Sequence, residues 1–270
     1  MMIDKLMTFL KGFIIGGTML VPGVSGGSMA IILGIYQRLV SAVSSFFKNK
    51  RENFFFLFLF AIGGGAGMLL ISKPILHLLE TYPMPMLYFF MGAVAGGVPL
   101  ILRQAKIKKF TWKVPLYTAI GLLIVLLIPF LPTGGVQTEM EAGLLSILLL
   151  ALTGFVAAAA LVLPGISVSY LLLLMGLYDE TMRAISKLYL PFLIPLGVGL
   201  ILGIILTTKL LDRAMSSHPQ PTYLIILGFI IASVAEIYPG LPGGVAELIL
   251  CFFMLCAGYA LVSLLSRKTK

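Results

Sequence analysis

The chain consists of long apolar runs, and two of these runs are interrupted by the same short motif. The two copies lie at residues 20–27 (LVPGVSGG) and 162–169 (VLPGISVS). Proline and glycine break helices, and a break leaves backbone N–H and C=O groups without the partners that hydrocarbon cannot supply. A break at membrane depth is therefore tolerated only where it lines a cavity or holds a ligand. The duplicated motif predicts where in the chain function resides.

The apolar runs themselves predict the fold class. Hydrophobic residues make up 60% of the 270 residues and charged residues only 11%, whereas about a quarter of a soluble domain is charged. Several runs approach the ~20 residues with which a helix crosses a bilayer, and a barrel would show shorter alternating segments. We expect an all-α polytopic membrane protein with apolar segments near 5–21, 26–46, 54–79, 83–102, 114–132, 144–163, 167–188, 190–212, 222–238 and 244–266.

The net charge of +9 is concentrated in short loops between the apolar runs. This distribution is typical of cytoplasmic loops beside an anionic lipid surface, and it argues against nucleic acid as a partner. Residues 1–11 lack a small-residue cleavage site, so we expect no removable signal peptide. Cys251 and Cys256 lie five residues apart in one run, on different sides of a helix, which predicts neither a disulfide nor a metal site.

The two motif copies belong to a longer internal repeat. At an offset of 142, Gly12, Pro22, Gly23, Ser25, Gly34 and Tyr36 fall on Gly154, Pro164, Gly165, Ser167, Gly176 and Tyr178. At an offset of 136, Phe56, Gly63, Gly67, Lys73, Pro83 and Gly92 fall on Phe192, Gly199, Gly203, Lys209, Pro219 and Gly228. We therefore expect two units. Residues 1–132 hold a broken hairpin and spans 54–79, 83–102 and 114–132, and residues 144–266 hold a second hairpin and spans 190–212, 222–238 and 244–266.

Basic loops orient these two units. The positive-inside rule places residues 48–51, the cluster 103–113 and the tail 267–270 in the cytoplasm, and it places the acidic loop around Glu139 and Glu141 outside. Both termini are then cytoplasmic, the first hairpin opens to the cytoplasm and the second opens to the exterior. Paired helix breaks in such an inverted repeat are typical of transporter binding sites. Each hairpin can be re-entrant or can cross the membrane twice, and Pro-Gly at the tip favours a re-entrant hairpin.

Each motif also has the chemistry of an anion site. A new helix should begin near Ser25 and near Ser167, and its first N–H groups lack intrahelical acceptors. Glycine lets a ligand approach the backbone, and serine hydroxyls can donate to an oxyanion. The candidate phosphate-binding residues are Pro22, Gly23, Val24, Ser25, Gly26, Gly27, Ser28, Pro164, Gly165, Ile166, Ser167 and Ser169. The alternative is that Pro-Gly only turns a hairpin and the serines cap it.

The two copies are not identical. The second has Val168 and Tyr170 at the positions of Gly26 and Ser28. A branched and an aromatic side chain leave less room for a ligand against the backbone than glycine and serine do. We therefore expect the first copy to make the closer phosphate contact.

Four charged residues in or near the spans are candidates for attracting a headgroup or for coupling. Lys73 and Lys209 are repeat equivalents that we expect near opposite membrane faces, where each can attract an anion or only reach toward the interface. Arg38 lies on the segment that follows Ser25, and it either has such a role or only obeys the positive-inside rule. Glu236 carries a coupling proton, neutralises a lysine or is only a carboxylate at the membrane rim.

Sequence patterns for catalysis are missing from the chain. It has no paired-carboxylate constellation, no zinc-spaced His/Cys cluster, no Walker loop and no Ser–His–Asp set. We therefore expect no enzymatic activity, no cofactor, no metal and no ATP-driven transport by this chain alone.

Residues 16–28 (GGTMLVPGVSGGS), continued by residues 34–38 (GIYQR), resemble the signature of the bacterial polyprenyl-phosphate transporter family, which was long catalogued as a domain of unknown function. The similarity extends over most of the chain. It implies that the protein returns undecaprenyl phosphate from the outer to the inner leaflet of the bacterial cell membrane, so that the lipid carrier is reused for cell-wall polymers. It also implies that residues 22–28 and 164–169 form the site.

Combined with the repeat, the resemblance predicts a lipid-phosphate flippase that works by alternating access. Its partners would be polyprenyl phosphate, membrane lipids and a coupling proton or other cation. Two alternatives remain open. A secondary transporter of a small or organic anion would use the same repeat, and a membrane-embedded enzyme would modify its lipid covalently.

Overall fold

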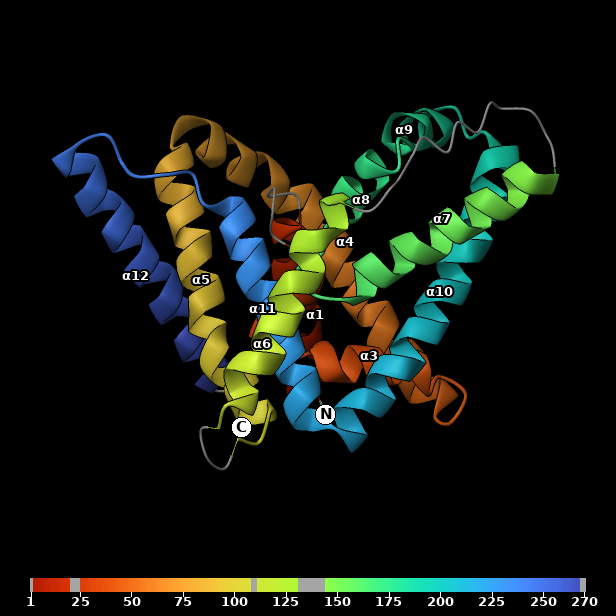
Figure 1. Cartoon of the computed structure of the whole chain (residues 1–270), viewed down its shortest axis with the longest axis horizontal. Helices are drawn as coiled ribbons and strands as arrows, with labels where there is room; N and C mark the ends of the chain where they lie inside the picture. The colour runs from red at the N-terminus through yellow and green to blue at the C-terminus, as the bar shows by residue number, and fades with distance from the viewer. Residues whose placement is uncertain (1, 20–24, 108–110, 131–143, 268–270) are drawn as a thin grey trace.

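The computed structural model describes residues 2–19, 25–107, 111–130 and 144–267, and these residues form helices without any strand (Figure 1). The helices are α1 (Met2–Thr18), α2 (Gly26–Ile32), α3 (Tyr36–Ser44), α4 (Lys50–Thr81), α5 (Pro83–Gln104), α6 (Lys113–Leu127), the short 3-10 turn η1 (Ile128–Phe130), α7 (Leu144–Val162), α8 (Val168–Leu174), α9 (Tyr178–Ser186), α10 (Leu190–Ser217), α11 (Pro219–Ile237) and α12 (Val245–Arg267). The prediction of an all-α protein is confirmed.

Within the described part of the chain, seven helices are long and apolar enough to cross a membrane, namely α4, α5, α6 with η1, α7, α10, α11 and α12. The number rises to eight if α2 and α3 are counted as one bent span. Helices α4, α6, α7, α10 and α12 carry many large apolar side chains that face outward, for example Leu69, Leu210 and Phe252, which are 80%, 72% and 68% exposed. Such a surface is stable only in lipid, so the chain is a multi-pass membrane protein.

Each of the apolar segments expected at 26–46 and 167–188 is divided into two helices in the structure. The first is divided into α2 and α3, which are bent by 116° relative to one another. Gly34 adopts a φ of +66° at this bend, and its equivalent Gly176 adopts +71° between α8 and α9. Glycine reaches this left-handed region without steric cost, so it ends a helix and redirects the chain.

Helices that occupy equivalent positions in the two halves pack in equivalent pairs. In the first half α1 lies along α4, and in the second half α7 lies along α10. The next helices pair between the halves, α5 with α12 and α11 with α6, while α5 and α11 contact each other in the centre. In Figure 1, α5 and α12 form one side of the molecule, α7 and α10 form the other, and α11 lies between.

Glycines make these close helix pairs possible. A methyl group on Gly12 of α1 would collide with the carbonyl oxygen of Phe60, and one on its equivalent Gly154 of α7 would collide with that of Leu196. The collision partners are themselves 136 residues apart. Small residues let helix backbones approach one another in membranes, where packing replaces the hydrophobic effect.

The interior of the bundle is centred on α2, α5 and α11. Ile31 and Ile32 of α2, Ile101 of α5, and Leu224 and Ile230 of α11 are almost completely buried. The short helix after the first motif is therefore held inside the protein.

Candidate functional site: a cavity between the two breaks

Both predicted helix starts lie at the serines of the motif. Ser25 is the N-cap of α2, and its Oγ accepts a hydrogen bond from the Ser28 backbone N–H at 3.1 Å. Ser167 is the N-cap of α8, and its Oγ accepts from the Tyr170 N–H at 3.3 Å. Serine is favoured at this position because its side chain replaces a missing intrahelical acceptor. The prediction that helices restart at these two residues is confirmed.

The two breaks touch each other in the folded chain. The Gly165 N–H donates to Ser25 Oγ at 3.0 Å, which joins residues 140 positions apart. Beside this bond, a methyl group on Gly27 would lie only 3.0 Å from Pro164 Cα. Gly165 has a φ of +83°, and any side chain on it would collide with the Phe229 carbonyl of α11. The second break is therefore fixed between the first break and α11.

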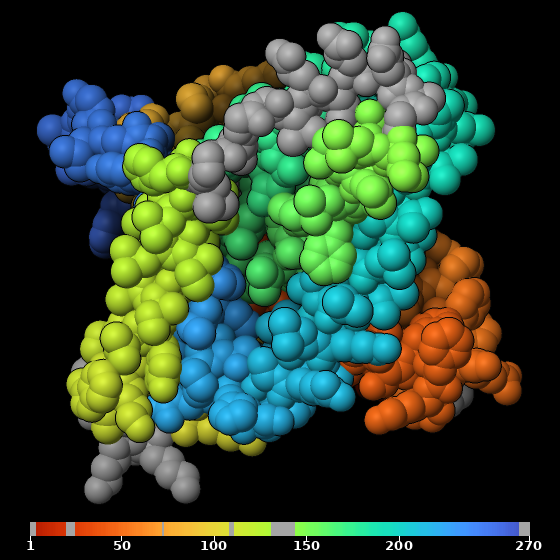
Figure 2. All heavy atoms as spheres, turned by 45° about the vertical axis from the view of Figure 1, so that its right-hand side comes forward, coloured from red at the N-terminus to blue at the C-terminus, as the bar shows by residue number. Residues whose placement is uncertain are grey.

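A cavity of about 1070 Å³ opens beside this contact. The first motif contributes Ser25 and Gly26 to its wall, and the second contributes Gly165, Ile166, Ser167, Val168, Ser169 and Tyr170. The remaining wall is formed by Met19, Leu79, Pro83, Leu87, Ala160, Leu161, Tyr178, Glu236 and Ile237. In a second view the molecular surface is hollowed between α6 and α7 (Figure 2).

The described wall of the cavity carries hydroxyls and one carboxylate but no lysine or arginine. Ser25 Oγ already accepts two N–H groups and lies 3.0 Å from Ser28 Oγ. Ser167 Oγ accepts one N–H group and keeps its own hydrogen to donate. Ser169 has no hydrogen-bond partner among the residues that the structure describes, and it is exposed to the cavity. The second motif thus has the more available donors.

The structure separates the other motif residues. Ser28 is buried with 2% of its surface exposed, and neither it nor Gly27 nor Pro164 lines the cavity. Pro22, Gly23 and Val24 lie outside the described residues. The expectation that the first copy makes the closer phosphate contact stays a prediction, but the geometry of this conformation favours the second copy.

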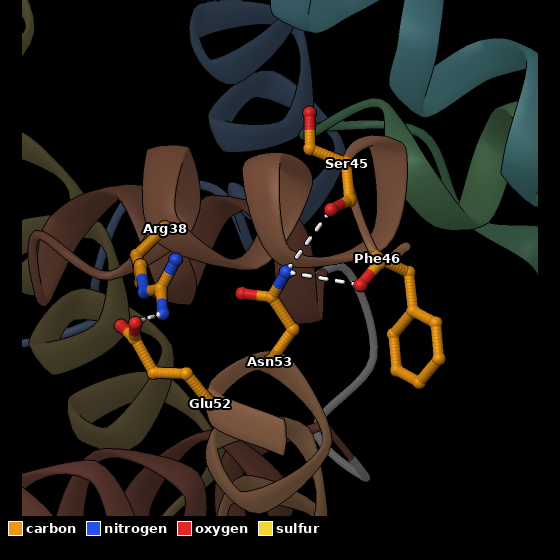
Figure 3. A network of polar contacts seen from close by, with 5 residues as sticks. All are labelled: Arg38, Ser45, Phe46, Glu52 and Asn53. Carbon is orange, nitrogen blue, oxygen red and sulfur yellow. Dashed lines mark hydrogen bonds and ion pairs between the residues drawn. The ribbon is translucent and has the colours of Figure 1, made fainter. Parts of the chain in front are cut away.

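The four charged candidates lie in different places. Glu236 lines the cavity near the end of α11. Arg38 does not line it, because its guanidinium pairs with Glu52 Oε1 at 2.6 Å and lies 5.0 Å from the centre of the Phe56 ring (Figure 3). Lys73 and Lys209 are exposed and are also absent from the cavity wall.

One tyrosine of the repeat belongs to the cavity wall and its equivalent does not, which the sequence did not suggest. Tyr178 lines the cavity, whereas its repeat equivalent Tyr36 is buried and donates a hydrogen bond to the Val162 carbonyl at 2.8 Å. That carbonyl lies just before the second break. The sequence did show that Tyr36 and Tyr178 occupy equivalent positions of the repeat. Sequence equivalence alone could not indicate that the two side chains have different surroundings.

Comparison with known proteins gives one consistent result. A family model described as undecaprenyl phosphate translocase-like matches residues 15–247. A polyprenyl-phosphate transporter of Staphylococcus aureus is 32% identical over 98% of this chain and 97% of its own length. A second polyprenyl-phosphate transporter, from Vibrio cholerae, is 29% identical over 87% of this chain and 78% of its own length. No solved structure matches the chain.

Proposed function

Because the chain belongs to the undecaprenyl phosphate translocase-like family, we propose that it carries undecaprenyl phosphate or a closely related polyprenyl phosphate across the bacterial cytoplasmic membrane. The direction is from the outer to the inner leaflet, where the carrier is loaded again for cell-wall polymer synthesis. Both termini lie in the cytoplasm. The observation that carries this proposal is the single cavity to which both motif copies contribute.

The phosphate is held at the two breaks by hydroxyl and backbone N–H groups. Ser167 and Ser169 are the principal donors, and Ser25 and Gly26 complete the wall on the other side. A site without fixed cations suits a substrate that must leave again, because a lysine or arginine buried beside a phosphate would hold it through strong charge-assisted bonds. The bare phosphate could not cross ~30 Å of hydrocarbon by itself.

The prenyl tail stays in lipid while the phosphate crosses through the protein. The surface is hollowed between α6 and α7 in Figure 2, and both helices expose apolar side chains, such as Leu123 and Leu126 of α6 and Leu148 of α7. A tail can leave the bundle through such an opening without losing contact with hydrocarbon. The site therefore has a polar end for the phosphate and an apolar exit for the chain.

Transport follows from an inverted repeat, in which the two halves exchange conformations around a fixed centre. The equivalent helix pairs α1–α4 and α7–α10, and the contact between the breaks, support this proposal. Glu236, at the cavity wall, is the group that would carry a coupling proton.

The experiment is a leaflet-accessibility assay in liposomes that contain labelled undecaprenyl phosphate and the protein, with and without an imposed proton gradient. An impermeant phosphatase reports the phosphate in the outer leaflet. We expect the doubly substituted Ser167→Ala, Ser169→Ala protein to lose more than about tenfold in rate, since a hydrogen bond to a charged group contributes roughly 1.5–3 kcal/mol. Ser186→Ala, a serine of α9 outside the cavity, is the matched control.

Three results would contradict the proposal. Unchanged transport by the double variant would refute the site. Uptake of a soluble anion by liposomes without any polyprenyl phosphate would favour the small-anion transporter. Covalent alteration of the lipid, detected by product analysis, would favour an enzyme.

A further inference from the structure

The two halves differ at the helices that follow the breaks. The first-half helix α3 packs along α10 of the second half. The equivalent pair would be α9 with α4, but among the described residues α9 has no comparable packing on α4. Likewise α2 packs on α5, and α8 makes no comparable contact with α11. The two halves are therefore packed against each other at α3 but not at α9.

The closed side has a polar contact that the open side lacks. Ser41 Oγ donates to Asp212 Oδ1 at 2.9 Å, and Ser44 Oγ donates to Asp212 Oδ2 at 2.7 Å. Both oxygens of one carboxylate on α10 are thus bound by hydroxyls of α3. Hydrogen bonds to an ionised acceptor are short and about twice as strong as neutral ones.

Helix α3 is also attached firmly to its own half. The amide of Asn53 at the start of α4 donates to the Ser45 carbonyl at 3.1 Å and to the Phe46 carbonyl at 3.4 Å, just beyond the end of α3 (Figure 3). The Arg38–Glu52 ion pair adds a second attachment. Helix α3 and the start of α4 can therefore move as one body, with Asp212 as its polar contact with α10.

This contact lies on the side of the molecule opposite the cavity. Asp212 is near the end of α10, and Figure 1 shows that end together with α3 on the side where α1 begins and α12 ends. The cavity wall instead includes Leu79 and Pro83 from the junction of α4 and α5, together with the end of α11. These elements lie on the other side in Figure 1.

The repeat offers no second copy of this contact. At the offsets found in the sequence, Ser41, Ser44 and Asp212 correspond to Arg183, Ser186 and Leu76. Ser186 keeps a bond to a carbonyl of its own helix, Arg183, at 2.9 Å. On the opposite helix, however, the position equivalent to the acceptor Asp212 is Leu76, whose side chain cannot accept a hydrogen bond.

We propose that Asp212, Ser41 and Ser44 form a latch that holds α3 against α10 and closes the cavity toward the side of the chain termini. The latch rests on the proposed function in one respect only: it must open each time the substrate leaves on that side. In the absence of substrate, the latch determines the fraction of protein molecules in which the cavity is open to the opposite side.

The first test measures this distribution without any substrate. In a background in which Cys251 and Cys256 are replaced by alanine, Leu87→Cys places a reporter in the cavity wall. An impermeant maleimide is added outside liposomes that contain the protein but no polyprenyl phosphate, and labelling is measured for the molecules whose termini face the lumen. We expect labelling to fall at least threefold in Asp212→Asn and in the Ser41→Ala, Ser44→Ala pair, and to stay unchanged in Ser186→Ala. Asparagine keeps the shape but offers one acceptor oxygen instead of two. Unchanged labelling in the folded latch variants would overturn the proposal.

The second test locks the latch and does not depend on those variants. Cysteines replacing Ser44 and Asp212 are cross-linked by mild oxidation in the same background. We expect transport to stop in the cross-linked protein and to return on reduction, and undiminished transport after cross-linking would refute the latch. If the unmodified protein fails to move polyprenyl phosphate while labelling still responds to Asp212→Asn, the proposed substrate is wrong and the latch stands.

Discussion

At the scale of single residues, Ser25 has two roles that a motif cannot distinguish. It caps its own helix, and it also binds the Gly165 N–H of the other break. Ser167 occupies the same place in the second motif but only caps α8. The same residue type at equivalent positions of the two motifs therefore differs in its hydrogen-bond partners.

This difference predicts unequal effects of removing the two hydroxyls. Ser25→Ala leaves two N–H groups unpaired inside the protein and should destabilise it by about 1–3 kcal/mol, whereas Ser167→Ala should cost less because its one acceptor bond is longer and more exposed. Thermal unfolding in detergent measures both. Equal shifts in the unfolding temperature would show that the Ser25–Gly165 bond contributes nothing.

At the scale of elements, the bends between α2 and α3 and between α8 and α9 are the same motif. The Gly34 N–H bonds the Ile31 carbonyl and the next N–H bonds the Ala30 carbonyl. Gly176 repeats both bonds with Leu173 and Leu172. This is the Schellman arrangement, which requires a left-handed residue at the position of the glycine.

We expect Gly176→Ala to destabilise the protein by roughly 1–2 kcal/mol, since alanine resists a φ of +71°. No atom lies within 4 Å of the added methyl, so backbone strain is the only cost. Gly197→Ala in α10 is the matched control, because its methyl also meets nothing within 4 Å and a helix interior favours alanine. If Gly197→Ala destabilised the protein as much as Gly176→Ala, the cost could not be assigned to the left-handed φ of Gly176.

At the scale of the whole molecule, the proposed alternating access predicts that the asymmetry between the halves is reversed in a second conformation. If the halves exchange roles, α9 should come to rest on α4 in the other state, as α3 rests on α10 in this one. Leu76 and Arg183 are both exposed here, at the positions equivalent to Asp212 and Ser41.

A pair of cysteines at positions 76 and 183 should therefore cross-link slowly in the resting protein and faster by at least several-fold during transport. Loss of the latch through Asp212→Asn should also accelerate it, because that change favours the other state. Gel mobility after oxidation follows the reaction. A cross-linking rate that changes neither during transport nor in Asp212→Asn would argue against an exchange of conformations between the halves.

The sequence alone determined the class of protein and the two residues at which helices restart after the Pro-Gly motifs. Hydropathy, Pro-Gly and the repeat register depend on neighbours along the chain, so the all-α class, the helix starts at Ser25 and Ser167 and the family were predictable. The bends at Gly34 and Gly176 were missed because their glycines lie inside apolar runs that hydropathy reads as continuous.

Only the tertiary structure decided which equivalent residues face the cavity. It buried Ser28 and Tyr36, placed Ser169 and Tyr178 in the cavity wall, paired Arg38 with Glu52, and brought Asp212 to Ser41 and Ser44. The physical reason is that the two copies have different neighbours in the fold. Helix α3 packs on α10, whereas among the described residues α9 has no comparable packing on α4, and this difference depends on contacts between residues that are far apart in the chain.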